Sequence, residues 1–190
     1  ITFTNSRAQV QGTLGPVLSF LGIDSAGGAI EATVNASGPA ADPVVTAQFK
    51  GRDLFFRQFS APAAQGRVAM YDTDSVTWTD LTLSKADSRI VTTGTLSLRQ
   101  GSKIDASILV RTNGSSRGRI TGRARIGPRT LKGSVSIQDL DVAALDPWIP
   151  FPAAANATVD AKVLLGGSVQ NPEAEVDAVL VEPRYGTYRA

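Results

Sequence analysis

The sequence predicts an all-β fold: an antiparallel or mixed β-sheet whose strands each have one apolar face, with few or no helices. Three observations lead to this class: a period-two alternation of apolar and polar residues, turn signals between the alternating segments, and a wealth of Gly, Val, Thr, Ile and Ser. Successive side chains of a strand point to opposite faces, so the alternation gives each strand one apolar and one polar face. Helical spacing does not produce this pattern.

The alternation continues almost to the end of the chain. It predicts strands at 28–36, 44–50, 89–99, 103–111, 119–126, 131–138, 157–165 and 174–180. Residues 67–83 predict two further strands around Asp72-Thr73-Asp74, with Trp78 and Leu81 on opposite faces. Among the turns, Asn113-Gly114 between two alternating runs is the strongest hairpin signal.

Two apolar stretches interrupt the alternation. Residues 14–22 have the spacing of one or two short helical turns, and residues 140–152 cannot remain helical because Pro147, Pro150 and Pro152 follow closely. We expect both to be short apolar plugs between β runs, with Trp148 either an exposed anchor or, more commonly for its type, a cap on a core.

Similar sequence follows each plug, which indicates an internal repeat. Gly38 is followed by Asp42-Pro43, and Gly167 by Asn171-Pro172, in each case between two alternating strands. Asp or Asn before Pro initiates a turn. We therefore expect 1–190 to be one continuous β-rich segment, with a first repeat-like module at 12–138 and the start of a second at 139–190. Because the chain begins and ends in strand-like sequence, we expect a larger parent protein.

The apolar parity of the predicted strands forms the candidate binding surface. Something must cover these side chains, since fully burying one is worth about 1.5–3 kcal/mol. Two solutions remain open: a second sheet packed on the first, or a trough filled by lipid chains, in which small residues such as Gly94 and Gly122 either leave room or pack opposite larger partners. The candidate lining residues are Ile30, Val34, Val45, Phe49, Ile90, Leu96, Leu98, Ile104, Ile108, Val110, Ile120, Ile126, Leu131, Val135, Ile137, Val159, Val163, Leu165, Val176 and Leu180.

A basic stretch forms the second candidate surface. No acid occurs between Asp105 and Asp139, and four arginines in this interval share one parity: Arg117, Arg119, Arg123 and Arg125. This predicted outer stripe would either meet anionic headgroups or an acidic partner, or serve as a solvated face that protects the sheet edge. Nucleic acid is not expected, because the net charge is only +2 and no aromatic residue lies within residues 89–144.

Catalytic chemistry finds no support in the sequence. The chain has no His and no Cys, and it contains neither a nucleophile elbow nor a phosphate-binding glycine loop. We therefore expect a non-enzymatic protein with no catalytic residues, no metal and no cofactor. No apolar run reaches 18 residues, so none of the sequence predicts a membrane-spanning helix.

The order of these features resembles the TamB/AsmA-like family of bacterial envelope proteins, named for the translocation and assembly module TamB. The residues that carry the resemblance are Leu140, Leu145, Asp146-Pro147-Trp148-Ile149-Pro150, Gly167 and Asn171-Pro172, with a second set at Leu18, Leu21, Gly38 and Asp42-Pro43. The motifs cover most of the chain, but each alone is common.

The resemblance implies a curled antiparallel or mixed β-sheet (a β-taco or open half-barrel) with an apolar concave face. It also implies a periplasmic segment of a protein anchored in the inner membrane outside this stretch. Its groove would shield the acyl chains of phospholipids moving between inner and outer membranes, and its partner would be an outer-membrane barrel of the TamA type. Two alternatives remain: a β-strand-binding scaffold for outer-membrane protein (autotransporter) assembly, and a β-sandwich adhesin-like domain.

Overall fold

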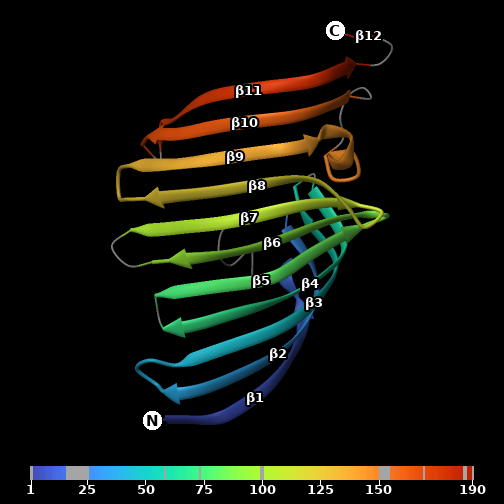
Figure 1. The fold of residues 1–190 in the computed structure, drawn as a ribbon. Helices are drawn as coiled ribbons and strands as arrows, with labels where there is room; N and C mark the ends of the chain where they lie inside the picture. Colours follow the sequence, from blue (N-terminus) through green and yellow to red (C-terminus); the bar gives the residue numbers. More distant parts are fainter. Residues whose placement is uncertain are drawn as a thin grey trace.

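All strands of the protein belong to one antiparallel sheet. The computed structural model describes residues 2–15, 26–57, 59–72, 74–98, 101–149, 155–168, 170–185 and 188–189. Its strands are ordered β1 to β12 exactly as in the sequence, each hydrogen-bonded to its neighbours (Figure 1). They are β1 (Thr2–Thr13), β2 (Ala26–Pro39), β3 (Val44–Phe56), β4 (Phe59–Asp72), β5 (Ser75–Lys85), β6 (Ser88–Ser97), β7 (Ser102–Thr112), β8 (Ser115–Ile126), β9 (Leu131–Asp141), β10 (Ala155–Gly167), β11 (Pro172–Tyr185) and β12 (Tyr188–Arg189). The predicted fold class is confirmed.

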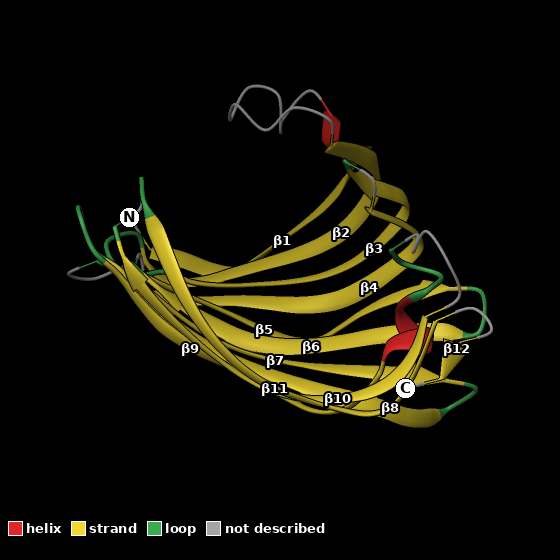
Figure 2. Cartoon of the chain, turned by 90° about the horizontal axis from the view of Figure 1, so that it is seen from above, coloured by secondary structure: helices red, strands yellow, loops and turns green. Residues whose placement is uncertain are grey.

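The sheet is curled rather than flat. Seen along the stack of strands, each strand bends so that the sheet forms an open trough (Figure 2). The trough runs across the strands, and the hairpin turns lie along its two rims. The turns that follow β2, β4, β6, β8 and β10 form what we call the open rim, and the opposite strand ends form the plug rim.

The register keeps the apolar parity of every strand on a single face. One row runs from Trp78 in β5 through Gly94, Ala106, Gly122, Val135 and Val163 to Val176 in β11. A parallel row joins Ile108, Ile120, Ile137, Ala161 and Ala178. Because cross-strand neighbours point to the same side of a sheet, these rows form continuous apolar tracks along the trough.

The 3-10 helix η1 (Val142–Leu145) forms a plug on this apolar face at one rim. Asp141 caps it by accepting a hydrogen bond from the Ala143 N–H at 3.0 Å. Ala144 packs with Val110 and Leu140 in the buried cluster of the protein. Since η1 lies inside the curve of the sheet in Figure 2, the apolar face is the concave one.

Trp148 fastens the plug to distant strands. Its side chain is only 1% exposed, and its ring stacks on Phe59 of β4 at a centroid distance of 5.4 Å. Its Nε1–H donates to Ser88 Oγ of β6 at 2.7 Å, and Ser88 Oγ donates to the Ala144 carbonyl at 3.4 Å. The expected apolar plug and the core-capping role of Trp148 are therefore confirmed.

A single layer leaves much of the protein uncovered. A compact globular protein of 19.9 kDa exposes about 8,700 Å² of surface, whereas this chain exposes 12590 Å². No second layer of strands covers the described sheet, so the sandwich architecture considered as an alternative is wrong.

Some local predictions were wrong. Trp78 and Leu81 face the same side, not opposite sides, because a bulge lies between them and Asp80 takes a positive φ of 52°. Leu98 lies just beyond the end of β6. Strand β1 was not expected beyond its first residues, although Ala8 and Val10 continue the apolar parity. Of the first predicted plug, Leu14 and Gly15 are helical, and residues 16–22 lie outside the described residues.

Both copies of the Gly-x-x-x-(Asp/Asn)-Pro motif lie at turns on the open rim. Gly38 follows the last β2 residue that pairs with β3, and Gly167 ends β10, with φ of 91° and 78°. A Cβ at Gly38 would lie 3.3 Å from the Asp42 carbonyl oxygen, and one at Gly167 would lie 2.5 Å from that of Asn171. Both positions therefore favour glycine for the same reason. The predicted module boundary, between residues 138 and 139, falls inside β9.

Candidate functional site: the concave apolar face and its basic lip

The register brings the predicted lining residues together on the concave face. Nineteen of the twenty lie in strands and share the apolar parity, and Leu98 follows β6 directly. Most are half-buried, which fits a concave wall without a covering layer. Val110 differs, because at 1% exposure it is sealed beneath the plug. Val176 and Leu180 on β11 are 62% and 55% exposed.

The middle of the concave wall is built from small residues, and the Trp78 side chain lies over one of them, Gly94. A Cβ at Gly94 would collide with the Trp78 ring, and the indole Nε1–H donates to Thr92 Oγ1 at 3.3 Å. The indole therefore fills the space above Gly94. At Gly122, by contrast, the nearest atom to an added Cβ is Val135 Cγ2 at 3.5 Å. The wall is thus shallow beside Trp78 and deeper beside Gly122.

The predicted arginine stripe shares the polar face, but its members have different surroundings. Arg117 lies 3.7 Å from Asp141 and Arg123 lies 3.7 Å from Asp105, each as an ion pair. Arg119 stands opposite Leu109 and Gln138. Arg125 stands between Lys103 of β7 and Lys132 of β9. Two of the four therefore lie beside an acid, whereas Arg125 lies beside two further cations.

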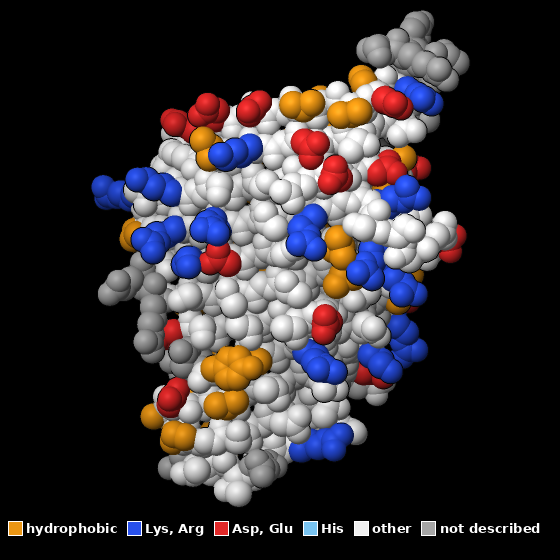
Figure 3. Space-filling model, viewed as in Figure 1, with side chains coloured by type: hydrophobic (Ala, Val, Ile, Leu, Met, Phe, Trp, Pro, Cys, Tyr) orange, Lys and Arg blue, Asp and Glu red, His pale blue; other side chains and the backbone are white. Residues whose placement is uncertain are grey.

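Two members of the stripe, Arg123 and Arg125, also belong to a basic cluster that spans three strands. Lys103, Arg125 and Lys132 form one row on the polar face near the open rim, with Arg123 in the next row and Arg129 in the β8–β9 turn. All five side chains are exposed. We call these five residues the basic lip; Figure 3 shows Lys and Arg side chains gathered at the ends of β7–β9 on this face. The sequence alone did not reveal Lys103 as a member.

The polar face also carries two shallow hollows. The one of about 790 Å³ spans β4 to β10 and includes Tyr71, Arg123 and Lys162 but neither Ile104 nor Ile108, which places it on the polar side. Most of its other side chains are Thr and Ser. The hollow of about 700 Å³ spans β1 to β5.

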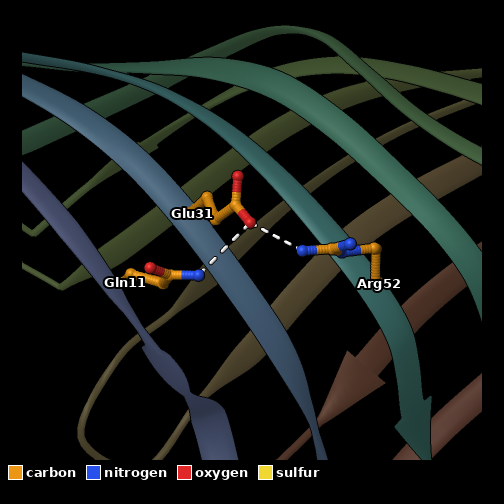
Figure 4. A network of polar contacts seen from close by, with 3 residues as sticks. All are labelled: Gln11, Glu31 and Arg52. Atoms are coloured by element: carbon orange, nitrogen blue, oxygen red, sulfur yellow. Dashed lines mark hydrogen bonds and ion pairs between the residues drawn. The ribbon is translucent and has the colours of Figure 1, made fainter.

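A small polar network borders the second hollow. Glu31 Oε1 accepts from Arg52 Nη2 at 2.6 Å and from Gln11 Nε2 at 3.4 Å, and thereby links β1, β2 and β3 (Figure 4). The Arg52 and Glu31 side chains are 68% and 49% exposed, so the network is a surface one. It contains no pair of groups arranged for acid–base chemistry.

In the described part of the chain, no three or more His, Cys, Asp or Glu side chains lie close enough to hold a metal ion. No helical segment of that part has the length and apolar character needed to cross a membrane.

Comparison with known proteins yields no relative: no family model, no curated protein and no solved structure matches this chain. The TamB/AsmA-like resemblance therefore stays a prediction, and the geometry of the sheet has to carry the functional argument.

Proposed function

We propose that the protein is a non-enzymatic, lipid-carrying segment whose concave face shields acyl chains, as part of a periplasmic factor that moves phospholipid between two membranes. The observation that carries the proposal is a single-layered sheet whose apolar concave face is continuous and, among the described residues, is covered only by the plug at one rim. In the same proposal the parent protein is anchored in the inner membrane and works with an outer-membrane barrel protein.

The size of the apolar wall suits acyl chains. Neighbouring strands are about 4.8 Å apart, so the ten spacings from β1 to β11 give a track of about 48 Å. Half of a bilayer's hydrocarbon core is about 15 Å thick. One extended acyl chain would therefore cover about three strands, and the wall has room for several chains in line.

The energetics favour an occupant. Every Å² of apolar wall surface left in water forgoes about 25 cal/mol of stabilising free energy. The chain exposes about 3,900 Å² more than a compact protein of its mass. An apolar ligand along the tracks would remove the part of this cost that falls on the concave face, without any change in the sheet.

Co-purified lipid provides the test. We expect native mass spectrometry of the purified chain to detect bound phospholipid or detergent. The variant Ile108→Asp, which places a carboxylate on the concave wall, should lose most of it. Leu109→Asp is the matched control, because the adjacent residue is equally half-buried but points to the polar face. Circular dichroism checks that both variants fold.

Two results would contradict the proposal: wild-type protein free of acyl chains after purification in the presence of phospholipid, or equal occupancy in both variants. Should Ile108→Asp unfold, Gly122→Asp repeats the measurement at a position where the wall is open.

Strand binding is the second candidate, and the free edge of β11 favours it. β12 pairs with β11 only at Arg184 and Tyr185, so the outer edge of β11 carries no partner strand along the described residues before them. Val179 and Val181 on this strand are 60% and 48% exposed. Such an edge accepts an added strand through main-chain hydrogen bonds. Pro substitution at Val179 should abolish binding of an extended apolar peptide if this candidate holds.

A further inference from the structure

We propose that the basic lip docks the protein on a bilayer surface rich in anionic headgroups. The proposal does not depend on lipid chains entering the trough. Its basis is the row of Lys103, Arg125 and Lys132, with Arg123 and Arg129 beside it.

The row opposes like charges on adjacent strands. Arg125 stands directly opposite Lys103 on one side and Lys132 on the other. Directly opposed like charges destabilise a sheet. An anionic surface bound at the lip would offset this cost.

The acids near the lip do not neutralise it. Asp105 is the carboxylate that contacts it, 3.0 Å from Lys103 and 3.7 Å from Arg123. Five cations and this one carboxylate leave a local charge of +4. Glu173 and Glu175 continue the same rows, but they lie two strands away on β11. The Lys103 and Arg123 side chains remain 53% and 76% exposed despite their ion pairs.

The reverse side of the same rim is apolar. Ile126 and Leu131 face each other at the start of the β8–β9 turn on the concave side, and Leu98 on the neighbouring turn is 51% exposed. The open rim therefore has cations outside and aliphatic side chains inside. A membrane interface combines anionic headgroups with an apolar interior and matches both sides of this rim. A nucleic acid would use aromatic stacking, and residues 89–144 contain no aromatic side chain.

Vesicle flotation of the full chain tests the docking. We expect binding to vesicles of phosphatidylcholine mixed with phosphatidylglycerol, weak binding to phosphatidylcholine alone, and release by salt. Each cation near an anionic surface is worth about a five-fold change in affinity. Arg125→Gln/Lys132→Gln should therefore weaken binding about twenty-five-fold.

The chain offers a matched control. Arg89→Gln/Arg111→Gln removes a second directly opposed pair of exposed cations, with the same change in net charge, from the plug rim. It should alter binding by less than about two-fold. An equal loss in the two double variants would overturn the proposal, because attraction would then follow net charge alone. Equal binding to both vesicle types, or tighter binding to a single-stranded oligonucleotide, would also overturn it.

The trough variant separates the two proposals. Ile108→Asp should leave vesicle binding unchanged, and loss of vesicle binding in this variant would refute docking through the lip. Vesicle binding without co-purified lipid would contradict only the lipid-carrying function, and co-purified lipid without vesicle binding would contradict only the docking.

Discussion

Replacing Trp148 with Ala should be among the most destabilising single substitutions in this protein. The side chain is 1% exposed, stacks on Phe59 and donates to Ser88 Oγ, so one residue joins the plug to β4 and β6. Removing a buried tryptophan side chain costs about 3–5 kcal/mol. Ser88 is itself 1% exposed and would lose a donor, which adds about 1 kcal/mol or more. The sum is a large part of the 5–15 kcal/mol that stabilises a typical domain.

Urea unfolding followed by far-UV circular dichroism measures this loss. Trp148→Phe is the informative comparison, since it retains an aromatic ring against Phe59 and removes the indole donor to Ser88. It should cost about 1–2 kcal/mol. In that variant Trp78 is the remaining tryptophan of the two, so its fluorescence reports on the concave wall alone. A loss below about 1 kcal/mol for Trp148→Ala would show that the plug does not stabilise the sheet.

Two further predictions concern the sheet itself. Gly94→Val should destabilise by about 1–3 kcal/mol in thermal unfolding, because its Cβ would collide with Trp78 and lie 2.6 Å from a backbone oxygen; Gly122→Ala, with ordinary contacts, should change stability far less, and equal losses would argue against the role of Trp78. Arg52→Ala should cost no more than about 1 kcal/mol in urea unfolding, since its pair with Glu31 is solvent-exposed; a larger loss would mean that the network holds β1 to β3 together.

The strands were predictable because period-two alternation is local. Each strand from β2 to β11 coincides with a predicted one. β6 ends at Ser97, two residues before its predicted end, and the others cover the predicted range or extend beyond it, since exposed strand ends and the stretches around Phe59 and residues 5–13 lack a clean contrast between faces. The turns at Gly38 and Gly167 were also predictable, because the requirement for glycine arises within five residues.

The pairing register of neighbouring strands was harder to predict from the sequence, and one bulge shows why. The Asn113-Gly114 hairpin pairs Thr112 with Ser115, and an unbroken ladder would then set Val110 against Arg117. The bulge next to Gly118, whose φ is 134°, instead sets Val110 against Gly118 and Lys103 against Arg125. Both apolar runs lie on even-numbered residues, so a two-residue turn between them requires such a shift. The sequence therefore indicates the bulge, but only when the two strands and the turn between them are considered together.

The need to consider neighbouring strands together also explains why the basic lip was not predicted as a cluster. Parity along one strand groups Arg117, Arg119, Arg123 and Arg125, whereas the environment of each is set by the strands on either side. Two of the four form ion pairs with Asp141 and Asp105, and one joins lysines that lie 22 residues before and seven residues after it. The contacts of the plug were equally hard to predict, because Trp148 and Phe59 are distant in sequence and meet only through the curl of the sheet.

The plug and the basic lip lie on opposite rims, and this asymmetry bears on how an amphipathic ligand would lie in the trough. On the plug rim, η1 covers Val110 and Leu140, so apolar side chains there are already dry and a charged headgroup would have to enter a buried cluster. On the open rim, Ile126 and Leu131 line the inside while Arg125 and Lys132 stand on the outside of the same two strands. Under the proposed function, acyl chains would therefore follow the apolar tracks and phosphates would lie at the open rim. A ligand held in this way keeps its charge in water and its chains out of water, which a symmetric trough would not enforce.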